Sequence, residues 1–97
     1  MADAVTAAPH VYKVLLENDR VRVLEYRGGP GAKADMHAHP DLVAVALRGG
    51  KVRFTLANGE TQDAQLADGE PGFFDATEHM TENVGSSEIH IVLVELK

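Results

Sequence analysis

Two histidines at alternate positions, His37 and His39, are the residues of this sequence with the clearest capacity for chemistry. If their segment is a β-strand, side chains at i and i+2 point to the same face, so both imidazoles project into one space. A third imidazole, from His79, follows the turn-rich stretch 68–72 and must be brought to the pair by the fold. Three converging imidazoles suit a divalent transition metal: iron, zinc, nickel, manganese or copper. The sequence therefore predicts a metal site with these three histidines as ligands.

The composition excludes several other classes of function. The chain has 97 residues, the size of one domain, and a formal net charge of −6 from 15 acidic and 9 basic side chains. Nucleic-acid binding depends on clustered Lys and Arg, whereas the basic residues here are scattered, so we expect no nucleic-acid partner. The absence of cysteine excludes disulfides, Fe–S clusters and thiol nucleophiles. A chain this small buries little surface alone, which favours a homodimer.

The first ten residues carry little pattern. We expect residues 1–10 to form a flexible arm, or a strand that becomes ordered against a partner subunit, followed by one domain over residues 11–97. An aspartate at position 3, with no Lys or Arg and no apolar stretch around it, argues against a secretory signal. No apolar run approaches the roughly 20 residues that cross a membrane. We therefore expect a cytoplasmic protein with no membrane partner.

From residue 11 onward the sequence predicts short β-strands bounded by turn residues. Asn58-Gly59 is a strong signal for a β-hairpin, and the continuous apolar run at 42–47 is typical of a strand buried on both faces. No stretch shows the periodicity of a helix of useful length. The pattern predicts an all-β, antiparallel sandwich or barrel with little or no helix, from strands at 11–16, 21–26, 34–40, 42–47, 51–56, 60–66 and 89–96.

The histidine pair lies inside a pattern that resembles the first motif of the cupin superfamily. That motif is a glycine, five residues, His-x-His, three or four residues, a glutamate, six residues and a glycine. Here Gly31 precedes His37 and His39 at the expected spacing, and Gly50 occupies the last position. Counting back from Gly50 places Val43 where the motif has its glutamate.

A second, degraded motif strengthens the resemblance, which covers about residues 18–97. Gly69, His79 and Asn83 match its glycine, histidine and asparagine, whereas its internal proline appears as Asp75 and its internal glycine is missing. The resemblance implies a small β-barrel of jelly-roll type, commonly dimeric, with a metal in its mouth. Segments 17–26, 37–41 and 94–97 are most similar to compact single-domain cupins, some of them connected with β-alanine degradation. Similarity to that group does not indicate a particular reaction.

The loss of the glutamate changes the chemistry that we expect. Strand parity places Val43 on the same face as His37 and His39, so it should point at the metal space without offering an oxygen. Three neutral imidazoles leave the charge of the ion uncompensated, which favours a small anionic or bidentate substrate. Cupin-like dioxygenases with three-histidine iron sites, acting on thiols or diketones, are the nearest enzymes that the resemblance offers. A three-histidine metal enzyme of this oxidoreductase type is the first hypothesis.

Other functions stay open at this level. With zinc, the same ligands would support hydrolysis or hydration through a bound water whose pKa falls to about 7. A metal-binding or ligand-binding module without turnover, and a cupin that has lost its metal, are further alternatives. Asp41 could replace the missing carboxylate, although its place after Pro40 favours a turn. We expect Asn83 to brace a loop, His90 to be a hydrogen-bonded core or interface residue, His10 to lie on the surface and Arg53 to face outward.

Overall fold

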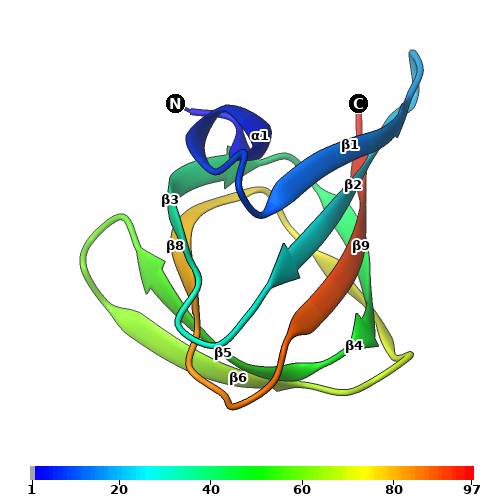
Figure 1. Cartoon of the computed structure of the whole chain (residues 1–97). Coiled ribbons are helices and arrows are strands. Elements are labelled where there is room, and N and C mark those ends of the chain that lie inside the picture. Colours follow the sequence, from blue (N-terminus) through cyan, green and yellow to red (C-terminus); the bar gives the residue numbers. More distant parts are fainter. Residues whose placement is uncertain (1) are drawn as a thin grey trace.

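A computed structural model describes residues 2–97, in which one short helix and nine β-strands are found (Figure 1). The predicted strand segments all form strands, and the predicted Asn58-Gly59 hairpin joins the strands Gly50–Leu56 and Thr61–Leu66. Two strands, Pro71–Phe74 and Thr77–Asn83, the second of which contains His79, were not assigned from the sequence. The elements are α1 (Ala4–Ala7), β1 (Tyr12–Glu17), β2 (Val21–Gly28), β3 (Lys33–His39), β4 (Leu42–Arg48), β5 (Gly50–Leu56), β6 (Thr61–Leu66), β7 (Pro71–Phe74), β8 (Thr77–Asn83) and β9 (Ile89–Leu96).

Two antiparallel sheets form the walls of a barrel that is not closed (Figure 1). One sheet has the order β1-β2-β9-β4-β7 and the other the order β3-β8-β5-β6. These pairings confirm the predicted all-β, antiparallel jelly-roll architecture. They also place β3 beside β8, although the two strands are far apart in the sequence. The strands that carry the three histidines are therefore neighbours.

The core lies between the two sheets, where alternate side chains of facing strands meet. Leu24 of β2 and Ile89 of β9 are fully buried at its centre. Period-two alternation explains this placement, because every second residue of a strand faces the same side of its sheet. The buried apolar residues are Ala4, Ala8, Val11, Tyr12, Leu24, Tyr26, Ala34, Leu42, Ala46, Val52, Ile89 and Leu93.

The apolar strand β4 is not buried on both faces, so that expectation was wrong. Leu42 and Ala46 point into the core, but Val43 is 37% exposed and Leu47 is 54% exposed. A continuous apolar run is buried on both faces when further elements cover the sheet, as in parallel α/β folds. In this fold no described element covers the outer face of β4. Its outward apolar residues therefore form part of an exposed apolar surface.

Within the arm that we expected over residues 1–10, of which residue 1 lies outside the described part of the chain, residues 2–8 pack against the barrel. Helix α1 packs against β3 and β1 and lies at one end of the barrel in Figure 1. The backbone N–H of Ala38 donates to the carbonyl of Ala2 at 2.8 Å, and Ala4 and Ala8 are fully buried. Small alanine side chains allow this close approach without producing a hydrophobic pattern. Among residues 2–97 no helix is long and apolar enough to cross a membrane.

Two glycines of the first motif have structural roles in the barrel. Gly31, in the turn before β3, has a φ of +82°, which is unfavourable for residues with a side chain. Its N–H donates to the carbonyl of Asn83 at 2.8 Å, which ties the first motif to the second. A Cβ on Gly50 would lie 3.0 Å from Cγ1 of buried Ile89. Both positions therefore favour glycine for reasons of backbone geometry and packing.

Candidate metal centre

Three histidines lie together on the inner face of the four-stranded sheet. β3 contributes His37 and His39, and its antiparallel neighbour β8 contributes His79, directly opposite His37 in the register. Alternation turns all three side chains inward, and both histidines of β3 are buried. The candidate ligand atoms of the three residues all lie within 4.8 Å of one another. The fold therefore brings the three sequence-predicted residues into one cluster that is compatible with metal binding.

Hydrogen bonds fix which ring nitrogen carries the proton in His37 and in His39. Nδ1 of His37 lies 2.7 Å from the carbonyl oxygen of Asp35, and Nδ1 of His39 lies 2.6 Å from Oε2 of Glu95. A carbonyl and an ionised carboxylate only accept, so Nδ1 carries the proton in both rings and Nε2 carries the lone pair. A metal needs that lone pair, and metal-binding histidines are commonly supported in this way.

Tyr12, at the start of β1, places a hydroxyl at the cluster. Its oxygen lies 3.3 Å from Nε2 of His37 and donates to the lone pair of that nitrogen. The ring packs edge-on against both His37 and His39. Burial, followed by the nearby Tyr26 and Glu95, raises the pKa of Tyr12, so the hydroxyl keeps its proton at neutral pH. Tyr12 is therefore a hydrogen-bond donor beside the three histidines.

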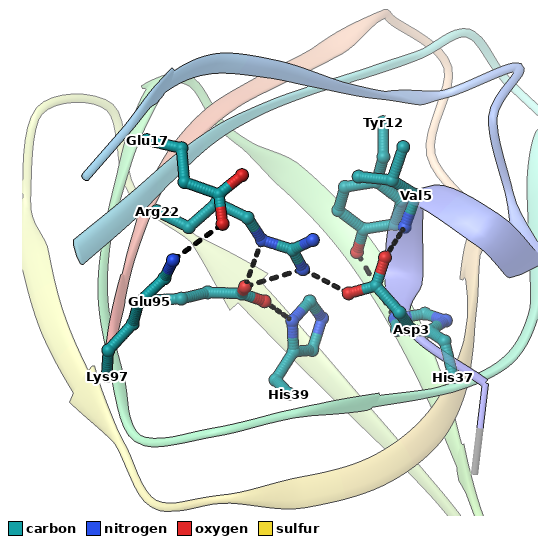
Figure 2. A network of polar contacts seen from close by, with 9 residues as sticks. All are labelled: Asp3, Val5, Tyr12, Glu17, Arg22, His37, His39, Glu95 and Lys97. Carbon is teal, nitrogen blue, oxygen red and sulfur yellow. Dashed lines mark hydrogen bonds and ion pairs between the residues drawn. The ribbon is translucent and has the colours of Figure 1, made fainter. Parts of the chain in front are cut away.

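Behind His39, a network of charged side chains extends to the N-terminal segment (Figure 2). Buried Glu95, on β9, accepts from His39 and from Arg22, whose Nε lies 2.9 Å from Oε1 of the carboxylate. Arg22 also pairs with Asp3, the residue that caps α1. Burial alone would raise the pKa of Glu95, but the hydrogen bonds from His39 and Arg22 and the charge of Arg22 hold it below its usual value. The carboxylate is thus ionised and orients His39.

Two of the three histidines are held in the neutral form that a metal requires. Burial lowers the pKa of His37, and the neighbouring His39 contributes in the same direction against the hydrogen bond to Asp35. Burial, together with His37 and His39, lowers the pKa of His79 to about 3. Protons therefore compete little with a metal for His79 above pH 5, and less for His37 than for an exposed histidine.

These shifts predict that the metal-free protein loses stability in weak acid. An unfolded histidine has a pKa of about 6.5. Between that value and the lower folded value the unfolded chain binds more protons, so the free energy of unfolding falls as the pH is lowered from 7 to 5. The slope is at most about 1.4 kcal/mol per pH unit for each histidine. Urea unfolding of EDTA-treated protein at several pH values between 5 and 7 measures this slope. We expect His79→Gln to reduce the slope, and an unchanged slope contradicts the shift.

A cavity of about 590 Å³ adjoins the cluster and extends between the sheets toward β6 and β7. His39, His79 and Tyr12 form part of its wall. The ring centroid of Phe54 lies 5.0 Å from that of His79. Among the described residues that line the cavity there is no Lys or Arg. Such a space accommodates a small molecule beside the histidines. Its apolar lining residues include Leu42, Ala44, Ala46, Val52, Phe54, Leu56, Leu66, Ile91 and Leu93.

The structure corrects the position of the missing carboxylate. Val43, expected to face the metal space, points out of the barrel, whereas Ala44 lines the cavity. The turn at 40–41 separates β3 from β4, so side-chain parity does not carry over from one strand to the next. The inward residues of β4 are Leu42, Ala44 and Ala46, and none of them offers a ligand atom. The cluster therefore still offers three histidines and no carboxylate from β4. The reason is that the inward residues of β4 are apolar, and not that Val43 faces the cluster.

Two further residues have structural roles, as the sequence favoured. Asp41 is exposed in the turn before β4, where its carboxylate accepts from the N–H of Ala76 at 2.8 Å. It does not belong to the histidine cluster. Asn83 is buried and donates to the carbonyls of Gly28 and Ser87, so it braces the loop after β8.

The remaining polar residues named from the sequence lie away from the cluster. His90 hydrogen-bonds through Nε2 to Glu25 at 2.8 Å, which confirms the expected hydrogen-bonded ring. His10 is exposed, as expected. Arg53 is also exposed and pairs with Asp63 on the neighbouring strand, which confirms that it faces outward. These residues contribute no ligand to the candidate metal centre.

The sequence interpretation missed Glu95 and Tyr12. For Glu95 a signal was present, because it continues the inward alternation of Ile89, Ile91 and Leu93 on a strand of the core. A charged residue at an inward strand position is rarely buried without a partner, which points to a functional or paired group. For Tyr12 no local pattern indicates the contact with His37, since pairing across the barrel creates it.

No protein-family profile matches the sequence, and no curated protein matches it either. Among solved structures, the chain is similar to a cupin domain from Bordetella pertussis Tohama I, with 29% identity and a TM-score of 0.82 over 90% of this chain and 92% of that one. An RmlC-like cupin family protein with a double-stranded β-helix fold from Methanocaldococcus jannaschii gives a TM-score of 0.69 at 16% identity, over 89% and 78% of the two chains.

A conserved protein with a double-stranded β-helix domain from Klebsiella pneumoniae subsp. pneumoniae MGH 78578 gives a TM-score of 0.66 at 20% identity, over 88% of this chain and 70% of that one. This likeness and that to the Methanocaldococcus protein concern the fold alone. The match to the Bordetella domain spans nearly the whole of both chains. Together with the two facing sheets and the inward histidines of both motifs, these similarities identify the chain as a small cupin.

Proposed function

We propose that His37, His39 and His79 hold one divalent transition metal and that the adjoining cavity binds a small chelating ligand. The observation that carries this proposal is the convergence of the three imidazoles, with Nδ1 of His37 and His39 already engaged by Asp35 and Glu95. This arrangement leaves the Nε2 lone pairs of both rings on the side of the cluster, where a metal would replace the hydrogen bond from the Tyr12 hydroxyl to Nε2 of His37. Nitrogen donors of this kind suit iron, zinc, nickel or copper better than magnesium or calcium.

We further propose that the protein catalyses an O2-dependent oxidation of its ligand. A redox-active ion such as Fe(II) supplies the reactivity toward O2 in such a site. The protein contributes binding, orientation and exclusion of water. Tyr12 offers a hydrogen bond to the anionic head of the ligand, while apolar residues such as Phe54 and Leu93 keep the site dry. Because the three ligands are neutral, the head can supply the negative charge that the ion lacks.

Elemental analysis of untagged protein tests the metal centre. We expect about one equivalent of a transition metal in the wild type after reconstitution, and less than about a tenth in the double variant His37→Ala, His39→Ala. His10→Ala is the matched control, because His10 is an exposed histidine outside the cluster. Less than about a tenth of an equivalent in reconstituted wild type overturns the proposal.

O2 uptake by the iron-loaded protein tests turnover. Thiols and β-diketones are the first substrates to examine, and we expect consumption of O2 with at least one of them that the double variant lacks. Uptake by neither class, with iron bound at one equivalent, contradicts the oxidation and leaves a metal-binding module. Ester hydrolysis by the zinc-loaded protein in that case would identify the hydrolytic alternative.

We propose that two chains associate through the outer face of the five-stranded sheet. A continuous cross-strand row of apolar residues spans all five strands of that face: Phe73, Val43, Val94, Val23 and Leu16. Phe73 and Leu16, at its two ends, are 59% and 55% exposed. Apolar patches of this extent on a small domain commonly mark interfaces. A second copy offers the same row for an isologous contact.

Phe73→Glu is expected to convert the dimer to a monomer, because it places a charge within the apolar row. Light scattering after size-exclusion chromatography should give twice the chain mass of 10.4 kDa for the wild type and the single mass for the variant. Thr61→Glu, at an exposed position of β6 in the other sheet, serves as the control and should remain dimeric. A monomeric wild type contradicts the proposal.

A further inference from the structure

Thr81 has a buried hydroxyl without a hydrogen-bond partner. The residue is 7% exposed, and its Oγ1 is the one buried side-chain nitrogen or oxygen atom among residues 2–97 for which the protein provides no partner. Buried polar groups are nearly always hydrogen-bonded, so each exception needs an explanation. Thr81 lines the cavity, although its Oγ1 is itself covered, so a rotation about χ1 that exchanges Oγ1 with the methyl group would present the hydroxyl to a molecule bound there.

The position of Thr81 relates it to the histidine cluster. It follows His79 by two residues on β8, so both side chains face the cavity from the same strand, with Cα atoms about 7 Å apart. Its register partner on β5 is Phe54, whose ring also lies 5.0 Å from that of His79. A ligand whose head lies at the cluster and whose body lies along Phe54 therefore extends toward Thr81.

The charges of the cavity restrict what this ligand can carry. No Lys or Arg lines the cavity in the described part of the chain, whereas the carboxylates of Glu70 and Asp75 line its side near β7. A negative charge on the ligand finds a positive partner only at a metal held by the histidines. A second negative charge, farther along the ligand, would be desolvated without a partner and repelled by these two carboxylates.

We propose that the cavity selects a ligand with a single anionic, metal-chelating head, an apolar body and an uncharged polar group that hydrogen-bonds to Thr81. Such a ligand is a hydroxylated or carbonyl-bearing aliphatic or aromatic monoanion, and dicarboxylates and phosphates are disfavoured. The inference assumes the metal centre proposed above. It adds the substrate class and names Thr81 as the residue that recognises the far end of the substrate.

Hydroxamic acids provide suitable probes, because they chelate divalent metals through two oxygens as monoanions. Acetohydroxamate reports the metal centre alone. Hexanohydroxamate adds an apolar body, and its analogues with a terminal hydroxyl or a terminal carboxylate, in chains of four to six carbons, explore Thr81. Titration calorimetry with zinc-loaded wild type, Thr81→Val and Thr81→Ser gives the affinities, and zinc content is measured for each protein.

We expect hexanohydroxamate to bind at least about tenfold more tightly than acetohydroxamate, since each buried methylene adds to the affinity. The carboxylate probe should bind at least about tenfold more weakly than the hydroxyl probe of equal length. In Thr81→Val the ratio of the affinities for the hydroxyl and the unsubstituted probe should fall about three- to tenfold. Thr81→Ser should restore it, which a purely structural role of Thr81 does not predict.

The outcomes separate this inference from the proposal on which it depends. If zinc or acetohydroxamate does not bind to the wild type, the metal centre is overturned, and the proposal for Thr81 with it. If both bind but Thr81→Val leaves the ratio unchanged, or the carboxylate probe binds as well as the hydroxyl probe, only the present inference is overturned. In that case a metal centre without the proposed selectivity remains.

Discussion

Glu95→Gln is expected to lower the affinity for a divalent metal by about 10- to 100-fold and to destabilise the protein by about 3 kcal/mol or more. The substitution changes hardly any volume, so its effects come from charge and hydrogen bonding. Glu95 accepts from both His39 and Arg22 with its two oxygens. A glutamine has one accepting oxygen and one donating nitrogen, and it can satisfy only one of these partners.

Either arrangement of the glutamine harms the site. If its oxygen accepts from Arg22, its amide nitrogen faces Nδ1 of His39, which must then give up its proton. The proton moves to Nε2, and the lone pair needed by the metal is lost. If the oxygen accepts from His39, the amide opposes the guanidinium of Arg22, which keeps Asp3 as its remaining partner. Loss of one member of a buried ion pair is costly in either case.

Chemical unfolding with and without metal, and competition with a chelating dye, measure the two effects. Glu17→Gln is the matched control, because Glu17 pairs with Lys97 on the surface and such pairs contribute little to stability (Figure 2). We expect the control to match the wild type in both measurements. Wild-type metal affinity in Glu95→Gln would show that His39 does not depend on its carboxylate partner.

The sequence predicted the strands and the three histidines because both depend on local patterns. Alternation and turn residues define each strand, and the His-x-His spacing of 37–39 fixes a common face without knowledge of the rest of the fold. The position of His79 opposite His37 depends on the pairing of β3 with β8, which spacing alone does not determine. The resemblance to cupins supplied that step.

The network behind His39 could not be predicted, because three distant segments create it. Asp3 lies in a segment whose sequence carries little pattern. Arg22 alternates with apolar residues, as the outward side chains of a strand do. Only the antiparallel pairing of β2 with β9 places Arg22 directly opposite Glu95. The packing of α1 on β3 and β1 then gives Arg22 its second partner. The packing of the N-terminal segment is thereby linked to the orientation of His39, a candidate metal ligand.

Ala44→Glu is expected to raise the affinity for a divalent metal by at least about tenfold, because it adds a negatively charged donor to three neutral ones. Ala44 lines the cavity together with His39 and His79, and the cavity has room for a longer side chain. Without metal the new carboxylate is buried without a cationic partner, so the variant should be less stable than the wild type. Metal binding should reverse that loss.

Val43→Glu is the decisive control, because counting along the sequence places the missing glutamate at position 43, whereas the structure places position 44 inside the barrel. A carboxylate at position 43 lies on the outer face and should leave the metal affinity of the chain as it is. Dye competition on the two variants therefore distinguishes the parity count from the observed strand geometry. Equal affinities for Ala44→Glu and wild type would contradict a metal held by the three histidines within reach of position 44. A gain in Val43→Glu would instead support the parity count.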